Sequence, residues 1–207
     1  GTSLNMNANE VIANRAIELL GGNKGDYSII NPNDDVNCSQ STNDVIPTAG
    51  KMTSLRLLKN LKHELLQLHG ALCKKAEEFN DVIKMGRTQL QDAVPIRLGQ
   101  EFRAYSVAIM RDIHRMEKAM GEMRTLNLGG TAVGTGLNAD EAYLHRIVPI
   151  LSEVSDIDLA QAYDLIDATQ NLDVFVAVSG AVKACAVTLS KIANDLRLMS
   201  SGPRAGL

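Results

Sequence analysis

The fold class is decided by the stretch FVAVSGAVKACAVTLSKIANDLRLM, residues 175–199. Apolar side chains recur in it at alternating steps of three and four residues, from Phe175 through Val182 and Leu189 to Met199. Because an α-helix turns once in about 3.6 residues, this spacing puts these side chains on one side of a single helix. The stretch therefore predicts a long helix with one continuous apolar face.

Two further segments carry the same period. One covers residues 98–123. The other follows Ser41, Thr42 and Asn43, whose side chains suit a helix cap, and continues to about Phe79 with Pro47 tolerated in its first turn. Three such segments predict an all-α fold, an elongated bundle of long helices.

The length of the second helix indicates assembly. Residues 44–79 would span roughly 54 Å as one helix, whereas a compact globule of this chain length is roughly 43 Å across. Long amphipathic helices in one chain cannot cover all their apolar faces, so we expect a homo-oligomer. The alternative is a kinked helix in a monomer that folds back on itself.

Polar segments separate the helices. We expect a short helix from about Glu10 to Leu20, a polar loop at residues 86–92, and a second loop with several glycines at residues 127–138. Functional side chains are commonly found on such loops.

Composition narrows the classes of function. Hydrophobic residues make up 45% of the chain and charged residues 22%, with a net charge of −3, which gives no basic surface for a nucleic acid. Cys38, Cys73 and Cys185 form no zinc or disulfide pattern and suggest free thiols in a cytoplasmic protein. The apolar run at residues 174–182 is too short for a membrane span, and the sequence shows no secretory signal, so we expect no membrane partner.

Several kinds of site are disfavoured by the sequence. The four histidines are too widely spaced for a metal site. The glycine-rich segment at residues 129–136 lacks the lysine of a nucleotide-binding loop, and no serine or cysteine stands in a recognisable nucleophile elbow. We therefore expect no metal site, no nucleotide-binding loop and no covalent hydrolysis.

Small neutral hydrogen-bond donors remain, in three clusters. They are Thr2, Ser3 and Asn5; Ser41, Thr42 and Asn43; and Thr88 and Gln89. The second cluster precedes a long helix and so lies near the positive end of its dipole, which suits a carboxylate ligand. Each cluster alone is better explained as a turn or a helix cap, and only the set is informative about a carboxylate site.

These clusters also carry a resemblance. The motifs are GTSLNMNANEVIANRAIE (1–18), NPNDDVNCSQSTNDVIPT (31–48), GRTQLQDAVPIRLGQEF (86–102), GGTAVGTGLN (129–138) and SSGPRAGL (200–207). Together they resemble the aspartase/fumarase superfamily of helical lyases. Class II fumarases carry histidine where this chain has Asn31 and Gln89, so the chain is more similar to the aspartase branch. Asp35 departs from both branches, which usually show histidine there, and puts a secondary carboxylate site near Asn33 in doubt.

The resemblance implies an enzyme, a carbon-nitrogen lyase that reversibly eliminates ammonia from L-aspartate to give fumarate. It implies no cofactor, and substrate contacts from Thr2, Ser3, Asn5, Ser41, Thr42, Asn43, Thr88 and Gln89. The alternatives are a class II fumarase or a non-catalytic helical scaffold.

Members of the superfamily are longer at both ends, so the resemblance implies an internal fragment. Residues 1–40 would end an N-terminal domain, and residues 41–207 would begin the central bundle of a tetramer whose sites combine several subunits. The catalytic base would be a serine on a loop after Leu207, and we expect the 207 residues alone to be inactive. Arg204, in the last motif, is a possible positioning residue, but helix termination explains that motif better.

Overall fold

The structure is a computed structural model that describes residues 1–202. Helices dominate it, in the order α1 (Thr2–Leu19), η1 (Pro32–Val36), α2 (Thr42–Glu78), β1 (Ile83–Thr88), β2 (Gln91–Arg97), α3 (Leu98–Met123), β3 (Thr125–Leu126), α4 (Glu141–Ser155), β4 (Ala160–Gln161), α5 (Leu165–Gln170) and α6 (Asp173–Met199). The all-α fold and the three long helices are confirmed. Most of the motif at residues 200–207, Arg204 included, lies outside the described residues.

The chain packs as two compact units. The first comprises Gly1–Leu55 and Glu122–Asp173, and the second comprises Arg56–Gly121 and the segment from Val174 onward. These are units of packing, and the predicted domain boundary after residue 40 stays a prediction.

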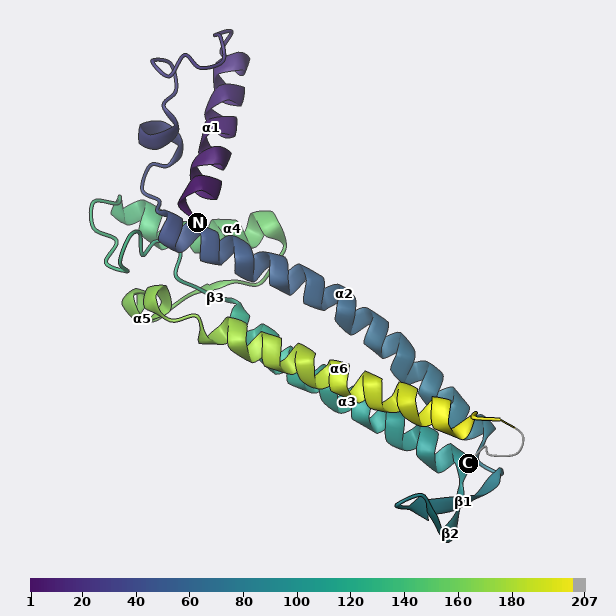
Figure 1. The fold of residues 1–207 in the computed structure, drawn as a ribbon. Coiled ribbons are helices and arrows are strands. Elements are labelled where there is room, and N and C mark those ends of the chain that lie inside the picture. Colours follow the sequence, from purple (N-terminus) through teal and green to yellow (C-terminus); the bar gives the residue numbers. More distant parts are fainter. Residues whose placement is uncertain (203–207) are drawn as a thin grey trace. The chain divides into compact units, whose positions relative to one another are not determined.

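The second unit is built on the predicted apolar stripes. The latter part of α2 lies alongside α3 and α6 (Figure 1). The side chains of Leu65, Ile113 and Cys185, one from each helix, are at most 3% exposed and belong to one apolar cluster. Such burial stabilises each large aliphatic side chain by about 1.5–3 kcal/mol, which explains why the periodicity predicted these helices well.

Helix α6 also has the length and composition of a membrane span. It is the one helix of residues 1–202 with these properties, with a mean hydropathy of 1.5 over its most apolar window. Core helices of soluble proteins have the same length and composition but are mostly buried, whereas 11% of this window is buried; the buried residues of α6 are Ala181, Cys185 and Ile192. The expectation of no membrane segment considered only residues 174–182, and the helix is longer than that run.

Strands β1 and β2 replace the polar loop predicted at residues 86–92, so that prediction was wrong. They pair antiparallel, and the pair Thr88 and Gln91 closes a two-residue turn. The register shifts beside Gly86, where an added Cβ would lie 2.8 Å from the carbonyl oxygen of Val94. The turn escaped prediction because Gln89 and Leu90 are not the asparagine and glycine that usually mark such hairpins.

Helix α1 belongs to the first unit and begins earlier than predicted, at Thr2 rather than near Glu10. Its buried positions are Asn5, Asn9, Ala13 and Ile17, which recur every fourth residue on one side of the helix. Two of the four are polar, so the apolar pattern does not reveal the first half. Asn5 and Asn9 both donate to the side-chain oxygen of Asn37, at 3.2 and 2.9 Å, which satisfies the buried amides.

The glycine-rich loop at residues 127–138 is confirmed as irregular structure in the first unit. Gly134 has φ of +92°, and a Cβ atom there would lie 2.4 Å from the backbone of Ile166 at the start of α5. Only glycine fits this close approach, so the loop packs tightly against α5.

Candidate functional site

Ser41 is the residue that caps helix α2. Its hydroxyl oxygen accepts from the backbone N–H of Asn43 at 3.2 Å, and its own N–H donates to the Asp44 carboxylate at 3.0 Å. This reciprocal pair is a capping box, with serine before the helix and an acid three residues later. The Ser41 hydroxyl hydrogen remains able to donate to a ligand at the positive end of the helix.

Asp44 also binds the glycine-rich loop. Its carboxylate accepts from the backbone N–H groups of Thr131 at 2.9 Å and Gly129 at 3.3 Å, and its side chain is fully buried. Burial raises the pKa of Asp44 above the ordinary carboxyl value, and hydrogen bonds from backbone N–H groups, that of Ser41 first, oppose the shift. Sequence reasoning noticed the cap but missed this second function, although the Ser-x-x-Asp pattern signals the capping half.

Asn43 and Asn127 complete the link between helix and loop. The Asn43 amide donates to the carbonyl of Ala132 at 2.7 Å, and the Asn127 amide donates to the carbonyl of Asn43 at 3.0 Å. The Asn43 amide nitrogen is thus already engaged, although its side chain was predicted to contact substrate.

Lys51 holds the beginning of the same segment. It is 5% exposed and donates to the carbonyl of Thr125 at 2.6 Å. Burial lowers the pKa of Lys51, and the nearby charge of Asp173 partly offsets this. Lys51 was not predicted to matter, because its partners lie far away in the sequence.

The cluster on α1 lies near the start of α2. A Cβ atom placed on Gly1 would lie 3.3 Å from Cγ2 of Thr42, so the two helix N-termini adjoin in the first unit. Thr2 and Ser3 are exposed, whereas Asn5 is buried and bonded to Asn37. Of the predicted α1 residues, Thr2 and Ser3 therefore have hydroxyls open to a ligand.

Thr88 and Gln89 belong to the second unit, at the tip of the hairpin. Gln89 and Leu90 have φ of +52° and +62°, the left-handed region that side chains other than glycine rarely adopt. The ion pair of Arg87 with Asp92, at 3.2 Å, joins the two strands beside the turn. The exposed Gln89 amide is thus displayed on a closed, strained turn.

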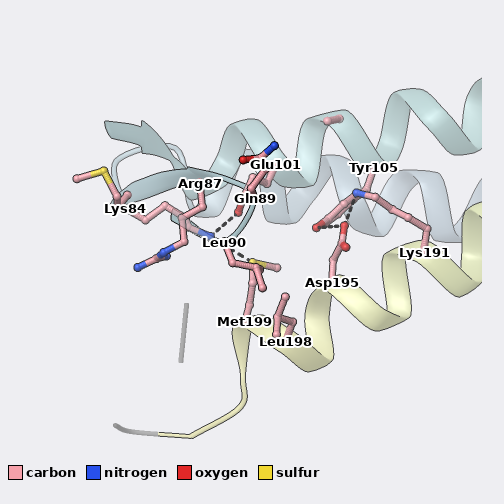
Figure 2. Close-up of a pocket in the computed structure, with 12 residues that line it drawn as sticks. Lys84, Arg87, Gln89, Leu90, Glu101, Tyr105, Lys191, Asp195, Leu198 and Met199 are labelled. Carbon is pink, nitrogen blue, oxygen red and sulfur yellow. Dashed lines mark hydrogen bonds and ion pairs between the residues drawn. The ribbon is translucent and has the colours of Figure 1, made fainter. Parts of the chain in front are cut away.

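A cavity of about 430 Å³ lies beside this turn (Figure 2). It is lined by Lys84, Met85, Arg87, Gln89, Leu90, Glu101, Ala104, Tyr105, Lys191, Asp195, Leu198 and Met199. Figure 2 shows Tyr105 and Lys191 converging on Asp195, to which the phenol donates at 3.0 Å and the ammonium forms an ion pair. Burial, followed by the neighbouring Asp195 carboxylate, raises the pKa of Tyr105.

The charges in this cavity are already paired. Lys84 pairs with Glu101 at 2.9 Å, Lys191 pairs with Asp195, and Arg87 pairs outside the lining. Among residues 1–202, each cation that lines the cavity already has a partner carboxylate, so Gln89 needs donors from elsewhere to form a dicarboxylate site.

Within the described residues, the structure brings together part of the predicted set. Thr42 adjoins the start of α1, and Ser41, Thr42 and Asn43 share the capped end of α2, all in the first unit. Thr88 and Gln89 share the turn in the second unit. Among residues 1–202 there is no group of three side chains suited to a metal ion.

Comparison with known proteins shows the family of the chain. A family model described as "Lyase" matches residues 1–207. The chain belongs to this lyase family. The lyase chain is 56% identical over its whole length to an aspartate ammonia-lyase of Bacillus subtilis and 53% identical to one of Helicobacter pylori, covering 44% of each. It thus spans less than half the length of these relatives.

Solved structures show the same fold. A fumarate lyase:delta crystallin of Brucella melitensis bound to cobalt has a TM-score of 0.96 at 53% identity, covering all of this lyase chain and 45% of that chain. A class II fumarase of Schistosoma mansoni has a TM-score of 0.86 at 34% identity, with 46% of that chain covered. The aspartate ammonia-lyases, at 50–56% identity, are more similar to the chain than this class II fumarase is, in agreement with the branch indicated by Asn31 and Gln89.

Proposed function

We propose that the protein is an aspartate ammonia-lyase, which eliminates ammonia from L-aspartate to give fumarate. The observation that carries the proposal is the capped end of α2, where Ser41 and Thr42 offer hydroxyls at the positive end of a long helix. The identities of 50–56% to aspartate ammonia-lyases support the same reaction.

The chemistry requires donors in fixed positions. Removal of the proton next to a carboxylate builds a second negative charge on that carboxylate, and preorganised donors stabilise such a charge better than water does. The helix N-terminus and the neutral hydroxyls of Thr2, Ser41 and Thr42 are donors of this kind. The loss of one such donor costs roughly 3–4 kcal/mol of transition-state stabilisation.

Thr88 and Gln89 would bind the other end of the substrate. In this proposal they come from a different copy of the chain than Ser41, and the base is a serine on a loop that this sequence does not include. Asn5 and Asn43 would then act mainly through the contacts that hold Asn37 and Ala132.

Assembly into a homo-tetramer follows from the same proposal. Leu57 on α2, Val107 on α3 and Val187 on α6 are all more than half exposed on the second unit. Large apolar side chains repeated along a helix bundle favour burial against another copy. We further propose that the protein is cytoplasmic and acts without a cofactor, since neutral donors can carry the chemistry.

The decisive experiment supplies L-aspartate or L-malate to the protein extended to the length of its relatives and measures ammonia and fumarate. Ammonia and fumarate from aspartate, without turnover of malate, is the expected result. Turnover of malate alone would overturn the ammonia-lyase proposal in favour of a fumarase. If neither substrate reacts and fumarate does not raise the melting temperature, the protein is a scaffold.

A further inference from the structure

Asp44 has a role that the proposed chemistry leaves open. Its side chain is fully buried, and both carboxylate oxygens are occupied: one accepts from Ser41, the other from Gly129 and Thr131. A carboxylate so placed does not touch a substrate. It joins the first turn of α2 to a loop 85 residues further along the chain.

Thr131 is held in an unfavourable conformation at this contact. Its φ is +56°, in the left-handed region, which is rare for a β-branched residue. Such a conformation persists only where the surroundings enforce it. Asp44 binds the N–H of Thr131 at 2.9 Å, and Asn43 binds the carbonyl of the next residue, Ala132, at 2.7 Å.

Hydrogen bonds also run in the other direction, because a side chain of the loop donates to the helix backbone. Asn127, which is fully buried, donates to the carbonyl of Asn43 at 3.0 Å and to the hydroxyl of Thr169 at 3.2 Å. Asn43 and Asp44 of the helix thus form hydrogen bonds to the loop, and Asn127 of the loop forms one to the helix. The donors Ser41 and Thr42 stand directly before these two residues.

We propose that Asp44 is a positioning residue, which fixes Thr131 in its left-handed conformation and thereby holds the Ser41 and Thr42 donors where they bind the substrate carboxylate. The inference rests on the proposed function for the identity of the substrate. The clamp between Asp44 and the loop can be measured without any substrate.

The kinetic test compares Asp44→Asn, Thr131→Gly and the double variant in the protein extended to the length of its relatives. An amide presents only one acceptor oxygen, so either the cap or the loop loses its partner. We expect Asp44→Asn to raise the KM for L-aspartate roughly tenfold, since small displacements of binding groups are costly. Glycine adopts the left-handed conformation unaided. The rise in KM that Asp44→Asn causes should therefore be smaller when residue 131 is glycine than when it is threonine.

Partial unfolding would not give this pattern, because it lowers the number of active molecules and leaves KM unchanged. An unchanged KM in Asp44→Asn, or the absence of any recovery by Thr131→Gly, would overturn the proposal. If Asp44→Asn does not fold, Asp44→Glu serves instead, because it keeps the charge and moves the carboxylate by one methylene. The same rise in KM and the same recovery are expected of it.

Hydrogen exchange separates this inference from the proposed function. In Asp44→Asn, the amides of residues 127–132 should exchange faster than in the wild type, with or without enzymatic activity. Unchanged exchange there would overturn the clamp. Asp112→Asn is the matched control, since Asp112 is also a buried carboxylate, 1% exposed, but binds Arg115 on α3. It should leave both KM and the exchange of residues 127–132 unchanged.

Discussion

Lys84 on β1 and Glu101 on α3 form an ion pair of 2.9 Å whose side chains are only 16% and 27% exposed. Partly buried pairs of this kind are screened less by water and salt than surface pairs. The pair therefore anchors the base of the hairpin to the helix, while its tip at Gln89 and Leu90 projects beyond the anchor. The backbone strain at the tip is therefore confined to Gln89 and Leu90, which have positive φ.

Replacing Leu90 with glycine should stabilise the second unit. Leu90 has φ of +62° and is 65% exposed, so the change relieves a left-handed conformation and removes little packing. We expect a gain of about 1 kcal/mol, or about 2–4 °C in melting temperature. Val94→Gly is the control, because Val94 lies in strand β2 at a similar exposure of 63%, and there glycine should destabilise. Destabilisation by Leu90→Gly would mean that the leucine side chain makes a contact that outweighs the strain.

Two glycines of helix α3 should respond to alanine in opposite ways. At Gly121 a Cβ atom meets nothing within 4 Å, so Gly121→Ala should stabilise by about 1 kcal/mol through helix propensity. At Gly99 the same atom would lie 2.3 Å from the carbonyl oxygen of Ala76, so Gly99→Ala must displace the end of α2. Urea denaturation of both variants tests the pair. Equal effects would show that the two helices are not packed this closely at Gly99.

Tyr143 should make the free energy of unfolding decrease at alkaline pH. Burial, followed by the charges of Asp44 and Cys38, raises the pKa of Tyr143 to about 12 from the ordinary value of 10.0. The unfolded chain therefore loses this proton first, so the stability contribution is complete below about pH 10 and is lost as the pH rises toward 12. Tyr143→Phe should remove this part of the decline in melting temperature between about pH 10 and about pH 12.

The control for Tyr143 is Tyr163→Phe, which removes a hydroxyl from a fully exposed ring. The hydroxyl of Tyr143 has no hydrogen-bond partner among residues 1–202, so Tyr143→Phe should cost little at neutral pH. An identical pH profile for the two variants would rule out this role for Tyr143.

Gln89→His should strongly reduce ammonia release without creating a fumarase. The exposed Gln89 amide lies at the turn tip, and a histidine there would not reproduce its donor geometry for the amino substrate. We expect about a 100-fold lower kcat on L-aspartate and no gain with L-malate, measured in the protein extended to the length of its relatives. Gln91→His, two residues away on β2, is the matched control and should keep its activity. Malate turnover by Gln89→His would mean that this one position selects the substrate.

The sequence predicted those parts of the fold that depend on local periodicity. Helix α3 begins at Leu98 and ends at Met123, as its apolar stripe indicated. The start of α1 was missed because Asn5 and Asn9 occupy its buried face, and their partner Asn37 lies directly after η1. Local pattern cannot show that a polar side chain is buried when its partner is distant in sequence.

In the candidate site, too, contacts between residues close in sequence could be predicted, and contacts between distant residues could not. Ser41 and Asp44 could be read as a capping pair, because both halves lie within four residues. The bonds from Asp44 to Gly129 and Thr131 join residues that no local signal connects. The hairpin at Gln89 was missed for a different reason, since its turn residues oppose the conformation that the structure imposes on them.

The spacing between Asp44 and Lys51 gives this part of α2 a fixed length. Both side chains are buried, two turns apart on one side of the helix, and they hold the segment from Thr125 to Thr131 at its two ends. Each helical residue advances about 1.5 Å and rotates about 100°. If one residue were inserted or deleted between them, one of the two side chains would rotate away from the segment while the other kept its contact. Substitution can therefore alter this stretch of α2 over evolution far more readily than any change in its number of residues.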